Sequence, residues 1–267
     1  MRNEHMAFLG GGNMAEAIIG GLLAGGVSME RHLTAADVSP ERRALLENKY
    51  GIATTADNAA AVRGADVVVL AVKPQQAAEV LVALKGVFTE KQLLVSICAG
   101  LPTSALEAQC TARAVRVMPN LPAQVRRGVA AICGGRRATP ADLDLVEEIF
   151  TAVGAVVRLP ENRINEVTAL SGSGPGYVFA FIEALEKTGV QMGLPAALAR
   201  KMAVETVRGA AELAAQTGTD PAELRQRVCS KGGTTLAGLA ALEAKGFSAA
   251  VAAGMQAARD RAAELAK

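Results

Sequence analysis

The sequence has no tryptophan, only two histidines (His5 and His32) and four scattered cysteines. No two cysteines have C-x-x-C spacing, so neither a zinc site nor histidine acid–base chemistry is indicated. Long hydrophobic runs are also missing: the longest, residues 67–72, is far shorter than the ~20 residues of a membrane span. Charge of one sign is not in excess, because residues 1–160 hold 16 basic and 15 acidic side chains and residues 161–267 hold 12 and 11. This balance argues against nucleic acid or an anionic membrane as the main partner.

What the sequence has is small and apolar side chains. Hydrophobic residues make up 51% of the 267 positions, which excludes a disordered chain. The chain has 54 alanines and 27 glycines, and such small residues allow helices to pack closely. The first turn signal comes at Gly10, too early for a signal peptide, so we expect a cytoplasmic protein.

The first part of the chain alternates short apolar runs with helical patterns, which is typical of a doubly wound α/β sheet. We expect strands at 6–9, 33–37, 65–72, 93–98, 114–118, 128–133 and 155–159. After Pro160 the strand patterns end and long alanine-rich helical patterns follow. The sequence therefore predicts a dinucleotide-binding domain over residues 1–160 and an all-α domain over residues 161–267.

Two of the later helical segments carry apolar stripes that are wider than one small bundle can cover. They span Tyr177–Leu185 and Met202–Leu213. The stripes are explained either by an ordinary core or by a large helical homodimer interface, and we favour the interface.

A glycine-rich turn follows the first predicted strand. Gly10, Gly12 and Ala15 fit the pattern G-x-G-x-x-A, with a helical pattern directly after it. The first glycine permits a tight turn, the second lets the backbone approach a pyrophosphate, and the helix presents free N–H groups to the phosphates. The alternative is a glycine turn without a ligand.

The type of dinucleotide stays open. Asp37 ends the second strand, where a carboxylate often holds the ribose hydroxyls of NAD. Arg42 and Arg43 follow closely and are placed to pair with the 2′-phosphate of NADP, or else to lie on a solvated helix face.

Three further segments combine strand ends or helix starts with small and polar residues. Lys73-Pro74 ends an apolar strand, where ligands bind in open α/β sheets. In residues 169–179 three glycines alternate with Ser and Pro, which suits either an anion-binding turn or a hinge. Residues 228–243 place Ser230, Gly233 and two threonines before a helix, which suits a carboxylate or a simple N-cap.

Together these segments resemble the pyrroline-5-carboxylate reductase family. The resemblance rests on LGGGNMAEA, LAVKPQ, SICAGL, RVMPN, ALSGSGPGYVF, VQMGLP and CSKGGTT, in that order, over residues 6 to 260. It implies an N-terminal Rossmann domain and an all-α C-terminal dimerisation domain, in a homodimer or a homodecamer of five dimers. It also implies reduction of the imine Δ1-pyrroline-5-carboxylate to L-proline, the last step of proline biosynthesis, with NADPH or NADH.

The resemblance also assigns roles to individual residues. The cofactor-binding positions would be Gly10, Gly11, Gly12, Asn13, Met14, Asn58, Ala71, Val72, Lys73, Pro74, Cys98 and Ala99. The substrate would meet Glu161, Ser230, Gly233, Thr234 and Thr235. Glu161 has the alternative of a surface carboxylate at a helix start. No metal is expected. The chain departs from the family pattern at Leu121, Arg126-Arg127, Gly176, Arg227 and Lys231.

This chemistry asks little of side chains, because a protonated imine is already a strong electrophile. The protein must hold the two rings at reacting distance and grip the ring carboxylate. We expect Thr235 to hydrogen-bond near the imine nitrogen and the amides of 233–235 to bind the carboxylate. Two alternatives are a β-hydroxyacid dehydrogenase, which would need a lysine before Lys187 in the helix after Gly176, and a non-catalytic dinucleotide sensor, which would not need the 228–235 segment.

Overall fold

The computed structural model describes residues 3–265, which form two compact units. The first unit consists of the chain up to Ser173 together with the residues from Ala258 onward, and the second spans Gly174–Ala257. The boundary predicted near residue 160 lies just after the last strand, which ends at Arg158, and not where the two compact units part. The division into domains 1–160 and 161–267 stays a prediction, and each compact unit is described by itself below.

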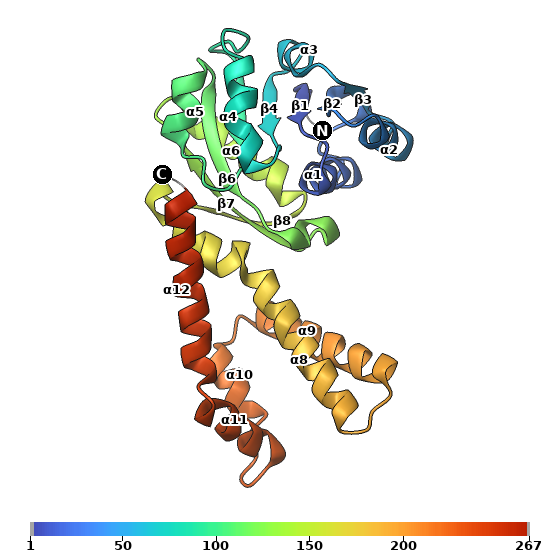
Figure 1. Ribbon diagram of the computed structural model, residues 1–267, viewed down its shortest axis with the longest axis vertical. Helices are drawn as coiled ribbons and strands as arrows, with labels where there is room; N and C mark the ends of the chain where they lie inside the picture. Colours follow the sequence, from blue (N-terminus) through green and yellow to red (C-terminus); the bar gives the residue numbers. More distant parts are fainter. Residues whose placement is uncertain (1–2, 266–267) are drawn as a thin grey trace. The chain divides into compact units, whose positions relative to one another are not determined.

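The first unit is built on one sheet of eight strands (Figure 1). Their spatial order is β3-β2-β1-β4-β5-β6-β7-β8, and all neighbours are parallel except the antiparallel pair β6 and β7. The strands are β1 (Met6–Leu9), β2 (Leu33–Ala36), β3 (Ala53–Thr55), β4 (Val67–Leu70), β5 (Leu93–Ser96), β6 (Arg113–Met118), β7 (Gly128–Gly134) and β8 (Gly154–Arg158). The order reverses between β1 and β4, which confirms the doubly wound Rossmann arrangement.

Helices cover both faces of this sheet. Alternate strand residues point to opposite faces, and apolar residues on both faces have to be buried. Met6 and Phe8 of β1 belong to the same core as α1 (Asn13–Ala24) and α6 (Pro140–Thr151), whereas Ala7 and Leu9 belong to the core under α3 (Asn58–Arg63), α4 (Pro74–Ala83) and α5 (Thr103–Gln109). Helix α2 (Pro40–Tyr50) contributes the fully buried Leu46 to the first core. The buried strands are apolar on both faces, as expected for a covered parallel sheet.

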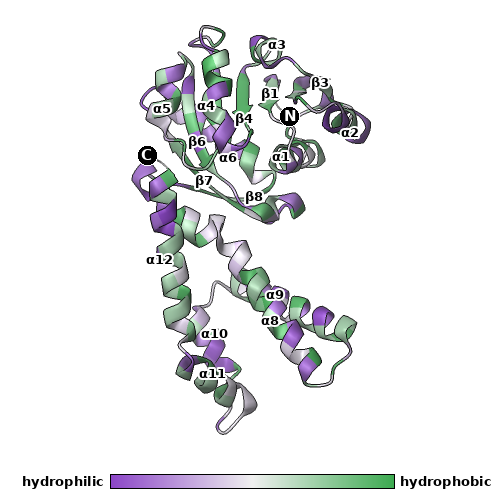
Figure 2. Ribbon diagram, viewed as in Figure 1, coloured by the Kyte–Doolittle hydropathy of each residue, from purple (hydrophilic) through white to green (hydrophobic). Residues whose placement is uncertain are grey.

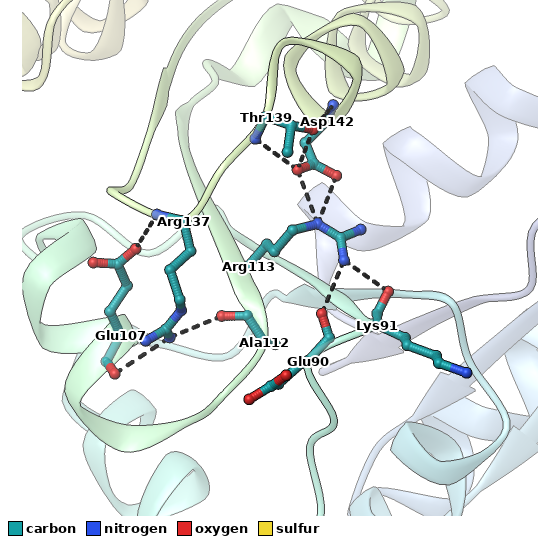
Figure 3. A network of polar contacts seen from close by, with 8 residues as sticks. All are labelled: Glu90, Lys91, Glu107, Ala112, Arg113, Arg137, Thr139 and Asp142. Carbon is teal, nitrogen blue, oxygen red and sulfur yellow. Dashed lines mark hydrogen bonds and ion pairs between the residues drawn. The ribbon is translucent and has the colours of Figure 1, made fainter.

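A polar network fixes the start of β6 at one end of the sheet (Figure 3). Arg113 Nε donates to both carboxylate oxygens of Asp142, at 2.9 and 3.1 Å, and its Nη1 donates to the carbonyls of Glu90 and Lys91. Asp142 also accepts from Thr139, in the capping box that begins α6. Burial raises the pKa of Asp142, but the hydrogen bonds from Arg113 and Thr139 outweigh it, so the pKa is lowered overall. The network ties α6 to the sheet.

The second unit consists of helices with little core of their own. They are α8 (Gly174–Gln191), α9 (Ala196–Thr217), α10 (Pro221–Arg227), α11 (Thr234–Ala244) and most of α12 (Phe247–Leu265). Helices α8 and α9 pack side by side, and hydrophobic residues follow their lengths (Figure 2). In this single chain Phe179, Met202 and Leu213 are each more than half exposed. Such surface is typical of a helical interface rather than of a monomer.

Within the described residues no single helix is long and apolar enough to cross a membrane. Helices α11 and α12 meet that test only as a pair, and they are bent by 52° where they join.

Candidate functional site

The glycine turn after β1 has the geometry of a phosphate-binding turn. Gly10 has a φ of +97°, and a Cβ there would lie 2.8 Å from the carbonyl oxygen of Ala71, so only glycine fits. Gly12 has ordinary extended φ and ψ, and a Cβ there would meet no atom within 4 Å. Gly12 is also the N-cap of α1 and makes no side-chain cap, so the first N–H groups of this helix lack a side-chain partner. The open side of the turn therefore suits an anion that approaches the backbone closely.

A cavity of about 430 Å³ lies beside this turn. Its lining includes six of the predicted cofactor positions, namely Gly10, Gly12, Asn58, Ala71, Val72 and Lys73. Asp37 and Val38, at the end of β2, line it as well. The cavity thus spans the carboxyl ends of β1, β2 and β4, at the switch point where ligands bind in such sheets. Its glycines, Gly10 and Gly12, allow a pyrophosphate to approach the backbone. The remaining predicted positions are Gly11, Asn13, Met14, Pro74, Cys98 and Ala99, which are outside this lining.

The carboxylate of Asp37 holds the glycine turn itself. Its Oδ2 accepts from the backbone N–H of Gly11 at 2.7 Å, and its Oδ1 accepts from that of Ser39 at 2.9 Å. The sequence pattern assigned Asp37 to a ribose, and this second role joins residues 26 positions apart. Asp37 is therefore both part of the cavity wall and a brace for the turn.

The two arginines that the sequence left open have different environments. Arg42 is turned to the glycine turn, where it donates to the carbonyl of Gly11 and pairs with Glu16. Burial raises the pKa of Glu16, but Lys49 and Arg42 outweigh it and lower the pKa overall. Arg43 instead donates from Nη1 to the carbonyl of Asp37 at 2.7 Å, which keeps its guanidinium next to the end of β2. Of the two, Arg43 donates to two residues of the cavity lining, Asp37 and Val38, and among residues 3–265 it forms no ion pair with a carboxylate.

Cys98 follows β5 and is buried. Its Sγ donates to the carbonyl of Val72 at 3.3 Å, and its N–H donates to Ser96 Oγ at 3.3 Å. Burial raises the pKa of this thiol to about 11, so it stays protonated at neutral pH and is no nucleophile. Its contact with Val72 joins the loop after β5 to the lining of the cavity.

Glu161 is held by groups of the first unit. Its Oε1 accepts from the N–H of Thr103 at 2.8 Å and from Arg116 Nη1 at 3.2 Å, and its Oε2 accepts from Thr103 Oγ1 at 2.6 Å. Thr103 and Arg116 are both buried. Neither was singled out from the sequence, because nothing local marks a contact across 58 residues.

The segment 169–179 is helical over most of its length. Residues Thr168–Gly172 form a π-helical turn, and α8 begins directly after it at Gly174. Asn120 Nδ2 donates to the carbonyl of Ser171 at 2.9 Å, which ties this turn to the segment after β6. The two compact units part between Ser173 and Gly174. The anion-binding turn and the hinge both stay predictions for this segment.

The turn before α11, in the second unit, offers backbone donors. Gly233 is the N-cap of α11 and makes no side-chain cap, and its own N–H donates to the carbonyl of Ser230 at 2.9 Å. Thr234 and Thr235 form the first turn of this helix. Ser230 and Lys231 also line a cavity of about 860 Å³ with residues of α10, α11 and α12, whereas Thr234 and Thr235 do not line it. The predicted substrate residues other than Glu161 thus cluster at one helix start.

Metal chemistry has no visible support. Among residues 3–265, no three His, Cys, Asp or Glu side chains are grouped so that they could hold a metal ion.

Comparison with known proteins points to one family. Residues 161–265 match the profile described as "Pyrroline-5-carboxylate reductase dimerisation", and residues 5–100 match "NADP oxidoreductase coenzyme F420-dependent". The chain is 40% identical to a pyrroline-5-carboxylate reductase of Methanosarcina acetivorans, with all of both chains covered. It superposes on the enzyme of that name from Coxiella burnetii with a TM-score of 0.93 and 37% identity, again over 100% of each chain. It also superposes, with a TM-score of 0.90 and 29% identity over 100% of each chain, on a Plasmodium falciparum pyrroline carboxylate reductase with NADP bound.

Proposed function

The chain belongs to the pyrroline-5-carboxylate reductase family, and from this premise we propose how its own residues carry the reaction. The protein is an NADP-dependent oxidoreductase that reduces the cyclic imine Δ1-pyrroline-5-carboxylate to L-proline, the last step of proline biosynthesis. The observation that carries the assignment of the coenzyme site is the open, uncapped glycine turn at Gly12, beside a cavity at the switch point of the sheet.

We assign the coenzyme to Gly10–Met14, Asn58, Ala71–Pro74 and Cys98-Ala99. The N–H groups at the start of α1 bind the pyrophosphate, because they lack a side-chain cap and the helix dipole favours an anion there. The bound dinucleotide supplies the hydride that reaches the imine carbon. The loops after β4 and β5 exclude water from the reacting face and fix its orientation.

We assign the substrate to the turn at 230–235 of the second unit. The N–H groups of residues 233–235 bind the ring carboxylate at the uncapped start of α11, and Ser230 Oγ adds a donor. Thr235 Oγ1 accepts a hydrogen bond from the N–H of the protonated imine, which aligns the C=N bond. No general base is needed, because the protonated imine is already electrophilic.

Arg43 is our candidate for the group that distinguishes NADPH from NADH. It lies beside the end of β2 and forms no ion pair within residues 3–265, whereas Arg42 pairs with Glu16. A guanidinium binds a phosphate through short, charge-assisted hydrogen bonds. Asp37 lies at the same edge and favours the free ribose hydroxyls of NADH, so both coenzymes are expected to react.

The all-α part makes the protein a homo-oligomer, and we propose a dimer that assembles further into a pentamer of dimers in the cytoplasm. The exposed apolar residues of α8 and α9 support a helical dimer interface. Sedimentation at micromolar concentration tests the dimer, and a monomeric protein would refute it. A species of ten chains is the expected larger assembly.

A steady-state assay tests the reaction. Oxidation of NADPH, and separately of NADH, is followed with Δ1-pyrroline-5-carboxylate, and reduction of NADP+ or NAD+ is followed with a β-hydroxyacid. We expect turnover only with the imine. Activity with the hydroxyacid alone would favour a β-hydroxyacid dehydrogenase, and binding of coenzyme without any turnover would favour a dinucleotide sensor.

A further inference from the structure

Glu161 joins three segments that are far apart in the sequence. It lies in the 3-10 turn η3 (Glu161–Arg163), directly after the sheet ends. Its carboxylate contacts the first residue of α5 and a buried arginine of β6. All of these residues belong to the first compact unit.

The contact of Glu161 with Thr103 caps the N-terminus of α5, which lacks a cap from its own N-cap residue. Helix α5 begins after Pro102, which makes no side-chain cap. Glu161 supplies the cap from outside, because it accepts from both the N–H and the Oγ1 of Thr103, at 2.8 and 2.6 Å. An acidic group is favourable at a helix N-terminus. The end of the loop that precedes α5 is therefore fixed by a carboxylate from another segment.

Arg116 fixes Glu161 in turn. Its side chain is 5% exposed, and its guanidinium forms an ion pair with Glu161 at 3.2 Å. A buried guanidinium needs a carboxylate partner, and β6 provides a rigid support for it. Arg116 and the N–H of Thr103 both donate to Oε1 of Glu161, so this carboxylate has little freedom to turn to a ligand.

The loop between β5 and α5 leads to the coenzyme cavity. It contains Cys98 and Ala99, and Cys98 contacts the carbonyl of Val72, which lines the cavity. At Gly100 the loop is packed closely against Leu265, since a Cβ there would lie 2.6 Å from its carbonyl oxygen. One end of the loop is bonded to the cavity wall, and Glu161 holds the other.

We propose that Glu161 is a positioning residue for coenzyme binding, which acts through Thr103 on the loop 97–102 and does not bind the substrate. This inference rests on the proposed function for the identity of the coenzyme site. It replaces the role in substrate binding that the sequence resemblance implied. A loop that is held in its binding conformation loses less freedom when the ligand binds, so removal of the cap weakens the coenzyme complex.

The test is a double-mutant cycle on full-length protein with Glu161→Gln and Thr103→Val. The dissociation constant of NADPH is measured without substrate, by the fluorescence of the coenzyme, and KM for Δ1-pyrroline-5-carboxylate is measured at saturating NADPH. Glu166→Gln is the matched control, because Glu166 is an exposed carboxylate of the same segment that pairs with Arg163. We expect each single variant to raise the NADPH dissociation constant about fivefold and the double variant no further. KM for the imine should stay within about twofold, and the control should match the wild type.

Three results would overturn the proposal. One is a raised KM for the imine with unchanged coenzyme binding, which would make Glu161 a substrate ligand. The second is independent, multiplying effects of the two substitutions. The third is unchanged coenzyme binding in Thr103→Val. This result can be obtained even if Glu161→Gln does not fold, because Thr103→Val keeps the ion pair of Glu161 with Arg116. Failure of the proposed function is seen separately, as absence of imine reduction by the wild type, and leaves the coenzyme titration interpretable.

Discussion

Replacement of Gly12 by alanine separates the ligand-binding role of the glycine turn from its role in folding. The backbone of Gly12 has a φ of −67° and a ψ of −178°, which alanine adopts without strain. A Cβ would meet no protein atom within 4 Å. The added methyl group therefore projects only into the space from which a pyrophosphate approaches.

The effect on stability is expected to be small because two terms oppose each other. Alanine is a poorer N-cap than glycine, which costs about 0.5–1 kcal/mol. Alanine also restricts the unfolded chain, which gains about 0.4–1 kcal/mol. The free energy of unfolding should thus change by less than about 1 kcal/mol. The dissociation constant of NADPH should rise at least about tenfold, or about 1.4 kcal/mol.

Gly10→Ala is the matched contrast in the same turn. It places a Cβ 2.8 Å from the carbonyl oxygen of Ala71 at a φ of +97°, and such strain costs about 1–3 kcal/mol of stability. Urea unfolding gives the stabilities, and titration of the coenzyme fluorescence gives the affinities, free of tryptophan emission because the chain has none. If Gly12→Ala binds NADPH as tightly as the wild type, the phosphate is not bound at this turn and the assignment of the site is wrong.

Three further outcomes are expected. Thr235→Ala should lower kcat/KM for the imine about tenfold, or about 1.4 kcal/mol, and Thr235→Ser should restore most of it; equal kinetics would remove the catalytic role. Arg43→Ala should raise KM for NADPH about tenfold and leave KM for NADH nearly unchanged, whereas Arg42→Ala should impair both coenzymes alike, so equal losses in the two variants would count against Arg43. The pKa of Asp142 is lowered in the folded protein, so its contribution to stability is present above pH ~4 and is lost as the pH falls through its folded pKa. Asp142→Asn should therefore lower the free energy of unfolding at pH 7 and make it depend less on acid pH. An unchanged profile in acid titrations of unfolding would refute this.

The central strands were predictable because a short run of apolar residues is typical of a strand that is buried on both faces. The run Val67–Leu70 is apolar throughout, as a strand with both faces covered must be. Strand β3 was missed because it has only three residues, Ala53–Thr55, and lies at the edge of the sheet, where no continuous apolar run is needed. The antiparallel pairing of β6 with β7 was also not predicted. The signal for it was the short connection, because residues 119–127 are too few for a crossover helix.

The site was predictable where chemistry needs glycine, and much less so where it needs a distant partner. The φ of Gly10 and the open space at Gly12 match the motif residue by residue. The helical turn within 169–179 was not predicted because glycine and serine favour turns locally, whereas the contact of Asn120 with Ser171 stabilises a helical turn. Tertiary contacts of this kind leave no periodic signal.

Two carboxylates, Asp37 and Glu161, have the same physical role at the edge of the sheet. Each was assigned to a ligand from its sequence position, and each accepts a backbone N–H from a loop that follows a parallel strand: Gly11 after β1 and Thr103 after β5. The segments that follow strands at this edge have N–H groups that no strand neighbour satisfies, and a carboxylate from another segment accepts from them. A reaction that depends on orienting a hydride donor and an imine benefits from such braces more than from an added acid or base. Their removal should therefore appear first in the affinity for the coenzyme.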